Sequence, residues 1–252
     1  MNYDLDEGIA GPRLGLIVLS TDETMEFEAR QVLAGCAVNL LHARIPSQSS
    51  VTPEELATMA GEMTSTAARL PEGLDAVAYG CTSGATIIGP ARVEALVQAA
   101  HPGVPVTNPM SATIAALHAL SAKRIALVTP YVASVTEPMR AHMAAQGIDT
   151  VSEVSFGQQD DRTVARISEA STLAAMRAAV ETAPGPVDAI FASCTNLRCF
   201  GIIEQAEVEL GLPVISSNSA LLWHLLSIAG QPSLGWGPGR LYAMPDAMPL
   251  PA

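Results

Sequence analysis

Short apolar runs alternate along the chain with longer stretches in which apolar residues recur at helical spacing. Residues 14–19 read LGLIVL, and the stretch 24–33 that follows has the spacing of an amphipathic helix. The succession returns with an apolar run at 37–45, which precedes a helical pattern at 52–70. A strand followed by a helix, repeated in this way, predicts an α/β fold.

The alternation continues to the middle of the chain. The run LDAVAYG at 74–80 predicts a strand before a helix at 85–99, and VPVTNP at 104–109 predicts another before a helix at 111–120. These runs are continuously apolar, so both faces of each strand need to be covered. The pattern therefore predicts parallel sheets flanked by helices.

The second half of the chain repeats the landmarks of the first. Three pairs of segments match: 13–20 with 124–130, 74–83 with 187–196, and 104–120 with 212–226. The paired segments lie 111, 113 and 108 residues apart and keep the same order. Such a repeat predicts two pseudo-symmetric lobes, with the active site in the cleft between them at the carboxyl ends of the strands.

The repeat also suggests where each lobe begins and ends. We assign the N-terminal lobe to residues 13–120 together with about 215–240, and the C-terminal lobe to residues 121–214. The stretch GWGPGRLYAMPDAMPLPA at 235–252 is rich in Gly and Pro. Residues 241–252 are therefore predicted to form an irregular tail.

Composition and charge narrow the class of partner. Of the 252 residues, 49% are hydrophobic and 15% are charged, and the net charge is −12, without a Lys/Arg cluster. We therefore expect the protein to bind neither nucleic acid nor anionic membranes. No apolar run reaches the roughly 18 residues of a membrane span, and the acidic N-terminus lacks the apolar core of a signal peptide. We expect a cytoplasmic protein.

The chain has four cysteines, Cys36, Cys81, Cys194 and Cys199. In a reducing compartment they are predicted to be free thiols. No CxxC pair is present, and no histidine lies close in sequence to Cys81 or Cys194, so no metal site is expected. Cys36 and Cys199 fit the ordinary role of small buried apolar residues.

Cys81 and Cys194 end equivalent strands of the repeat, so both are predicted to face one cleft. The residues after each thiol can present backbone N–H groups that favour an anion and lower the pKa of the thiol. We therefore expect these two thiols to react faster with alkylating agents than Cys36 and Cys199. The alternative is that CTSG and CTN merely begin helices.

Five landmarks carry a resemblance to a known family. They are STDETME at 20–26, AYGCTSG at 78–84, TPY at 129–131, GQQDDRTVARI at 157–167 and SCTNLR at 193–198. In this order they resemble the aspartate/glutamate racemase superfamily. The most similar branch contains the maleate cis-trans isomerases, the arylmalonate decarboxylases and the ectoine-utilisation protein EutA.

The resemblance implies chemistry without a cofactor at a carbon next to a carboxylate. In the racemases, two cysteines flank that carbon; in the maleate isomerases, the first cysteine adds to the alkene. The decarboxylases keep only the second cysteine and carry glycine at the position of Cys81. The resemblance assigns Cys81 as nucleophile or base and Cys194 as the opposing acid.

Substrate contacts follow from the same resemblance. The expected substrate-binding residues are Asp22, Thr82, Ser83, Tyr131, Asp161, Thr195 and Asn196. The isomerases resemble SNTTME in the first loop, so Asp22 replaces an Asn, and Asp161 also stands where they tend to carry Asn. Two carboxylates would repel a dicarboxylate but would pair with a cationic group on a substrate. The alternatives are a helix cap for Asp22 and a solvated loop for Asp161.

The sequence thus favours an isomerase or racemase that takes a small carboxylate or an amino acid. A maleate isomerase proper, which works through covalent addition of Cys81, is one alternative. A non-catalytic protein that binds small acids is the other. We also expect a homodimer and, from the resemblance to EutA, a role in ectoine utilisation.

Overall fold

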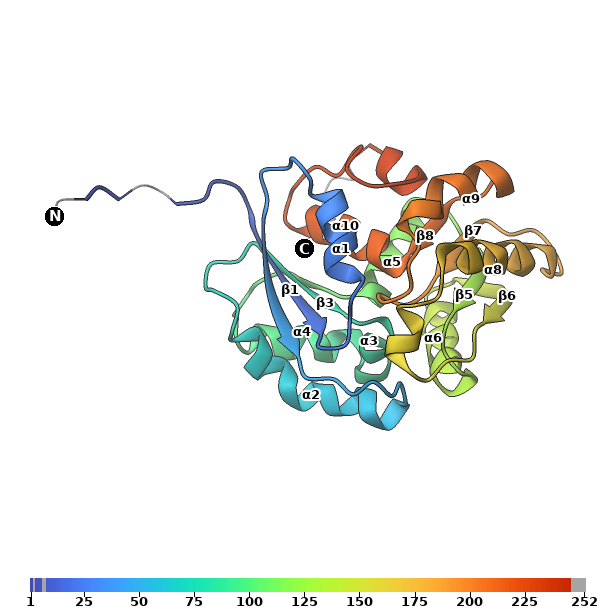
Figure 1. The fold of residues 1–252 in the computed structure, drawn as a ribbon, viewed down its shortest axis with the longest axis horizontal. Helices are drawn as coiled ribbons and strands as arrows, with labels where there is room; N and C mark the ends of the chain where they lie inside the picture. The colour runs from blue at the N-terminus through green and yellow to red at the C-terminus, as the bar shows by residue number, and fades with distance from the viewer. Residues whose placement is uncertain (2, 6–7, 246–252) are drawn as a thin grey trace.

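Two four-stranded parallel sheets form the centre of the molecule, a computed structural model that describes residues 1, 3–5 and 8–245 (Figure 1). The strands of the first sheet are β1 (Arg13–Leu19), β2 (Asn39–Ile45), β3 (Ala76–Gly80) and β4 (Val106–Thr107). Those of the second are β5 (Arg124–Thr129), β6 (Asp149–Ser155), β7 (Ala189–Ala192) and β8 (Val214–Ser216).

The two sheets have the same strand order. The first runs β2-β1-β3-β4 and the second β6-β5-β7-β8, and all neighbours are parallel. Each strand of one sheet therefore has a counterpart at the same place in the other. The predicted α/β fold with two repeated lobes is confirmed, and β3 and β7, which precede the two cysteines, are equivalent.

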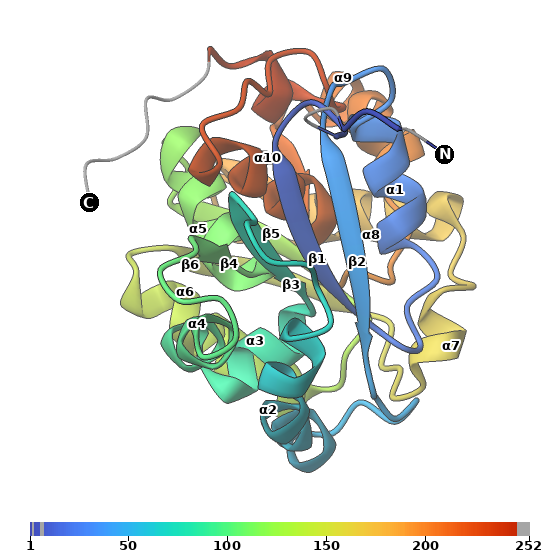
Figure 2. The same cartoon turned by 90° about the vertical axis from the view of Figure 1, so that its left-hand side faces the viewer.

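Helices cover the sheets, which explains the continuously apolar strands. They are α1 (Met25–Val32), α2 (Pro53–Ala67), α3 (Thr82–Ile88), α4 (Pro90–Gln98), α5 (Pro109–Ala119), α6 (Ala133–Ala145), α7 (Asp161–Val164), α8 (Glu169–Glu181), α9 (Ile203–Leu210) and α10 (Ser217–Ile228). Figures 1 and 2 show α1 and α10 on one side of the first sheet and α2 and α4 on the other. Every residue of β3 and β7 is buried.

The last long helix joins the two lobes. α10 follows β8 of the second sheet, yet it packs against β3 and β4 of the first sheet and against α5. This packing supports our proposal that about 215–240 belong with the N-terminal lobe.

One local prediction was wrong. The single helix expected at 85–99 is divided into α3 and α4, because Gly89 has a φ of +91° and Pro90 begins a new helix. The predicted irregular tail contains a 3₁₀ turn, η2 (Arg240–Ala243), in which Tyr242 is buried. The rest of that prediction, from residue 246 onward, lies outside the described residues. Within the described part of the chain, no helix is long and apolar enough to cross a membrane.

The buried carboxyl group of Glu28 forms hydrogen bonds that connect the two lobes. Glu28 of α1 accepts hydrogen bonds from the backbone N–H groups of Cys199 at 3.3 Å and Phe200 at 3.4 Å. Its second oxygen accepts from Asn218 Nδ2 at 2.7 Å, and the same amide donates to the carbonyl of Thr195 at 2.8 Å. Burial outweighs these donors and raises the pKa of Glu28 from 4.5 to about 7.

Replacing Glu28 with Gln should flatten the dependence of stability on pH. The folded protein holds the Glu28 proton more tightly than the unfolded chain, so this contribution is complete below pH 4.5 and is lost as the pH rises through about 7. The shift corresponds to about 3 kcal/mol in the free energy of unfolding. Urea unfolding at several pH values measures it. The exposed Glu62→Gln is the matched control, and equal slopes in Glu28→Gln and the wild type would contradict the assignment.

Candidate active site

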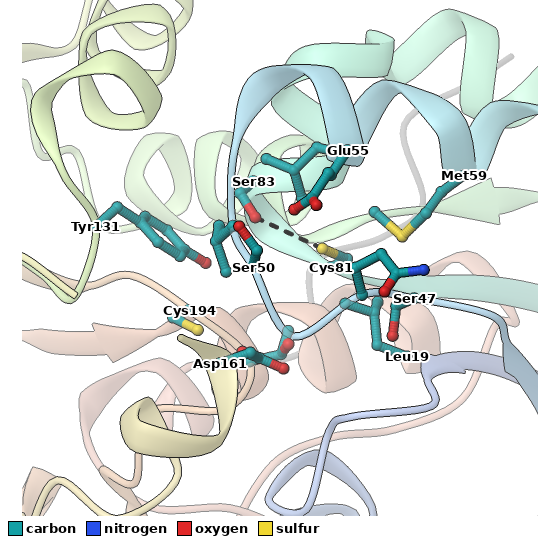
Figure 3. Close-up of a pocket in the computed structure, with 14 residues that line it drawn as sticks. Leu19, Ser47, Ser50, Glu55, Met59, Cys81, Ser83, Tyr131, Asp161 and Cys194 are labelled. Atoms are coloured by element: carbon teal, nitrogen blue, oxygen red, sulfur yellow. Dashed lines mark hydrogen bonds between the residues drawn. The ribbon is translucent and has the colours of Figure 1, made fainter. Parts of the chain in front are cut away.

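The two repeated cysteines line one small cavity between the lobes (Figure 3). Cys81 directly follows β3, and Cys194 stands two residues after β7. The cavity measures about 20 Å³, which is room for about one water molecule. The predicted cleft site is therefore present, in a closed form.

A loop from the N-terminal lobe closes the cavity by pairing with the C-terminal lobe. Ser50 and Asp160 form an antiparallel bridge. The Val51 N–H donates to the Gln159 carbonyl at 2.8 Å, and the Asp161 N–H donates to the Ser49 carbonyl at 2.8 Å. A substrate larger than one water molecule requires this cavity to widen.

Cys81 sits at the N-cap of α3 with an extended backbone. Its Sγ accepts a hydrogen bond from the Gly84 N–H at 3.2 Å and lies 3.7 Å from Ser83 Oγ. The Gly84 N–H that we expected to be available for a substrate anion is thus bound to the sulfur itself.

Tyr79, which the sequence analysis missed, lies beside the Cys81 thiol. Its fully buried hydroxyl donates to Met59 Sδ at 3.5 Å and lies close enough to the Cys81 sulfur to lower the pKa of that thiol. Gly84 leaves room for this cluster, because a Cβ there would overlap the Tyr79 hydroxyl and lie 3.0 Å from Cys81 Sγ. The signal was available in the sequence, since residues two apart on a strand point to the same face.

Cys194 has an unusual backbone. Its φ is +109°, a value that residues other than glycine rarely adopt. The Cys194 N–H donates to Ser217 Oγ at 2.9 Å, and Ser217 Oγ also accepts from Thr82 Oγ1 at 2.8 Å. Ser217 therefore ties the loop of one cysteine to the loop of the other. This residue was also missed, although it begins α10 directly after a buried strand.

Tyr131 lies where the sequence predicts, in the cavity wall. Its hydroxyl contacts Cys194 and Ser83 and is turned toward the cavity in Figure 3. Burial raises the pKa of Tyr131 well above its ordinary value, so this group is a neutral hydrogen-bond donor.

The expectation of low thiol pKa values was wrong. The pKa of Cys81 is raised from 9.0 to about 11, chiefly by burial and in part by the charge of Asp161, against the lowering effect of the Gly84 N–H. Burial also raises the pKa of Cys194 well above 9.0. The free-energy cost of desolvating a thiolate exceeds the stabilisation that one backbone N–H donor provides. Both thiols are therefore protonated in the empty site at neutral pH.

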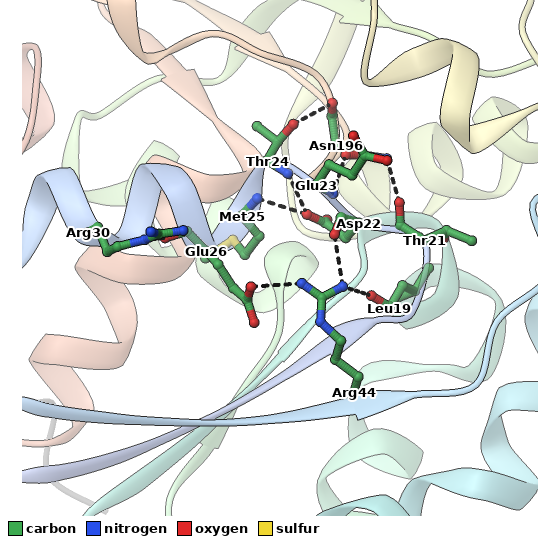
Figure 4. A network of polar contacts seen from close by, with 10 residues as sticks. All are labelled: Leu19, Thr21, Asp22, Glu23, Thr24, Met25, Glu26, Arg30, Arg44 and Asn196. Carbon is green, nitrogen blue, oxygen red and sulfur yellow. Dashed lines mark hydrogen bonds and ion pairs between the residues drawn. The ribbon is translucent and has the colours of Figure 1, made fainter.

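Three of the residues expected to bind substrate lie outside the cavity lining: Asp22, Thr82 and Asn196. Asp22 Oδ1 accepts from the N–H groups of Thr24 at 2.9 Å and Met25 at 2.8 Å, so the alternative of a helix cap describes it (Figure 4). Burial raises the pKa of Asp22 to about 6.

Asn196 is hydrogen-bonded to backbone groups of both lobes. Its Oδ1 accepts from the Glu23 N–H at 3.0 Å, and its Nδ2 donates to the carbonyls of Asp161 at 3.1 Å and Thr21 at 3.4 Å. These bonds position the loop that bears Thr21 and Asp22 (Figure 4).

The remaining predicted residues, Ser83, Asp161 and Thr195, line the cavity. Asp161 is only 6% exposed, so the alternative of a solvated loop was wrong. Burial raises its pKa, against a hydrogen bond that Thr21 Oγ1 donates to Asp161 Oδ2 at 2.6 Å. A second carboxylate, Glu55 of α2, also lines the cavity and was missed. Among the described residues, no group of three or more His, Cys, Asp or Glu side chains is arranged to hold a metal ion.

Comparison with known proteins identifies a family that matches most of the chain. A family model described as arylmalonate decarboxylase matches residues 14–242. The maleate isomerase of Nocardia farcinica is 29% identical over 94% of this chain and 97% of its own. The arylmalonate decarboxylase of Bordetella bronchiseptica is 33% identical over 51% of this chain and 53% of its own.

A solved structure is similar over nearly the whole chain. It is a Cys→Ser mutant of the Nocardia farcinica maleate cis-trans isomerase with a covalently bound succinylcysteine intermediate. It superposes with a TM-score of 0.80 and 26% identity, over 92% of this chain and 98% of that one.

Iodoacetamide should label the partly exposed Cys36 before Cys81 and Cys194 in the ligand-free protein at pH 7. Because the Cys81 pKa is about 11, its labelling rate should rise about tenfold per pH unit between pH 7 and 9. Mass spectrometry of the digested protein gives each rate. Faster labelling of Cys81 than of Cys36 at pH 7, with a plateau below pH 9, would contradict the buried, protonated thiol.

Replacing Tyr79 with Phe should raise the pKa of Cys81, because the thiolate loses a nearby hydroxyl group that stabilises it. Labelling of Cys81 at a fixed pH below that pKa should then slow by about two- to tenfold, as expected for the loss of one hydrogen bond. Tyr242→Phe is the matched control, since Tyr242 is equally buried but donates to the Ser219 carbonyl. An equal change in both variants would show that Tyr79 acts through general packing.

Proposed function

Because the chain belongs to the arylmalonate decarboxylase family, we propose that it is a cofactor-independent isomerase or racemase acting at a carbon next to a carboxylate. One observation carries this proposal: a thiol from each lobe lines the same cavity. A site that only binds an acid needs no such pair of reactive groups, so the arrangement favours catalysis over the non-catalytic alternative.

Cys81 separates this chain from the decarboxylase pattern, in which glycine occupies that position. The similarity to maleate isomerases over 94% of the chain supports isomerisation instead. Among the residues that line the cavity, the hydroxyl groups of Ser83, Tyr131 and Thr195 are suited to bind a substrate carboxylate.

In the racemase route, the thiolate of one cysteine removes the proton from the carbon next to the carboxylate. The resulting negative charge spreads onto the carboxylate, where hydroxyl donors stabilise it. The thiol of the other cysteine then delivers its proton to the opposite face. The substrate leaves as its enantiomer, and the two cysteines have exchanged protonation states.

In the alkene route, the thiolate of Cys81, formed by loss of its proton when the substrate binds, bonds to one alkene carbon while Cys194 gives its proton to the other. The product is a saturated thioether, about whose single bond the carboxylates can rotate. Return of the proton to Cys194 and cleavage of the S–C bond restore the alkene in the other configuration. The succinylcysteine captured in the Nocardia farcinica enzyme is a saturated adduct of this kind and supports this route for that protein.

We also propose a setting for the reaction. The substrate is a small carboxylate or an amino acid, the protein is a cytoplasmic homodimer, and it serves ectoine utilisation. The motifs AYGCTSG and SCTNLR, which resemble EutA, support the last of these. Size-exclusion chromatography with light scattering tests the dimer, and growth of a deletion strain on ectoine tests the role.

Proton exchange in D₂O separates the two routes. Maleate, both enantiomers of aspartate, diaminobutyrate and its N-acetyl forms are incubated with the protein and followed by NMR. Deuterium at the α-carbon with inversion identifies the racemase route. Conversion of maleate to fumarate identifies the alkene route.

The thiols should be indispensable in either case. Cys81→Ser and Cys194→Ser should each reduce interconversion by about 10²–10⁴-fold, because a hydroxyl is a far weaker acid than a thiol. Cys199→Ser, which changes a buried cysteine outside the cavity, is the control and should keep activity. Full activity in the variant that lacks both Cys81 and Cys194 would refute the mechanism.

A further inference from the structure

The charged side chains that line the cavity are all acidic. Two carboxylates, Glu55 and Asp161, line it, together with several hydroxyl groups. Among the described residues that form its wall, none is Lys, Arg or His. The side chains therefore offer no positive charge to balance the carboxylates.

The side-chain conformation of Glu55 differs from the one that the sequence at the start of α2 predicts. Thr52 caps α2 and accepts a hydrogen bond from the Glu55 N–H at 3.3 Å. In a complete capping box, the Glu side chain would reach back to the N–H of the cap residue. Glu55 Oε2 is instead buried without a hydrogen-bond partner in the described structure. Figure 3 shows its carboxylate turned toward Ser83 and the cavity.

Asp161 meets the cavity from the other lobe. It begins α7, is 6% exposed, and is fixed through Oδ2 by Thr21 Oγ1 at 2.6 Å. In Figure 3 the carboxylate of Glu55 lies above the Cys81 sulfur and that of Asp161 lies below it, so the two carboxylates approach the cavity from opposite sides.

This arrangement discriminates between ligands by charge. Asp161 is buried, and Glu55 is half-buried with its Oε2 shielded from water. A carboxylate that loses water without gaining a cationic partner carries a desolvation cost. A second carboxylate on the ligand would add repulsion, whereas a positively charged group would relieve it. A bound cation would also favour the thiolate forms of Cys81 and Cys194, which the empty site disfavours.

We propose that the substrate carries a positively charged amine as well as a carboxylate, and that Glu55 and Asp161 bind this amine from opposite sides of the cavity. The inference rests on the proposed function and narrows its substrate class to amino acids. Glu55 is then a specificity residue, and the hydroxyl groups of the wall remain available for the carboxylate.

Calorimetric binding of matched acids tests the inference. The Cys81→Ser/Cys194→Ser variant prevents turnover, and the pairs are succinate with aspartate and butyrate with 2-aminobutyrate, each amino acid as both enantiomers. At least one enantiomer of an amino acid should bind at least tenfold more tightly than its partner acid. Adding Glu55→Gln should reduce this preference about tenfold, as expected for loss of one hydrogen bond between charged groups.

Glu54→Gln is the matched control, since Glu54 is an exposed neighbour in the same helical turn. It should leave the preference unchanged. Equal affinities within each pair, no binding of any amino acid, or an unchanged preference in Glu55→Gln would each overturn the inference.

The outcomes also separate this inference from the proposed function. Thiol-dependent isomerisation of an acid without an amine, with no preference for amines, would contradict the inference alone. A clear preference for amines in a protein whose wild-type form neither racemises nor isomerises any of the acids tested would contradict the proposed function alone.

Discussion

The hydroxyl group of Ser217 holds together the two loops on which the site depends. It accepts a hydrogen bond from Thr82 beside one thiol and another from the backbone N–H of Cys194. The second bond supports a backbone with a φ of +109°, which costs energy for any residue except glycine. Thr195 Oγ1 adds a weaker link at the same place, a 3.4 Å hydrogen bond to the carbonyl of Gly80 at the end of β3. The symmetry of the fold brings the cysteines near each other, and Ser217 fixes how they face.

Desolvation dominates the electrostatics of the same region. Burial is the largest cause of the raised pKa values of Asp22, Glu28, Cys81 and Asp161. The closed loop that covers the cavity helps to keep water away, and the carboxylates add repulsion to every thiolate nearby. A site of this kind holds its thiols inactive when it is empty. A ligand with a complementary charge both fills the cavity and makes the thiolates accessible, so binding and activation become one event.

Much of the fold was predictable because it rests on patterns that are local in sequence. Continuous apolar runs gave the parallel strands, and the spacing of matched segments gave the repeat that places Cys81 and Cys194 in equivalent positions. The break at Gly89 was missed because helical spacing continues across it. Glu55, Tyr79 and Ser217 were missed because their importance depends on tertiary contacts: an unfilled capping box, a shared strand face and a junction between lobes. The thiol pKa values were misjudged because sequence reveals nearby donors but not the depth of burial.

The central claim is that the two thiols flank one reacting carbon. A crystal structure of the Cys81→Ser/Cys194→Ser variant with bound substrate tests it most directly, since both hydroxyl groups mark the positions of the sulfurs. The account predicts Ser Oγ atoms on opposite faces of a single carbon next to the carboxylate, each about 3–3.5 Å from it or from its hydrogen. A substrate that contacts only one of the two hydroxyl groups, or that binds outside this cavity, would contradict the account.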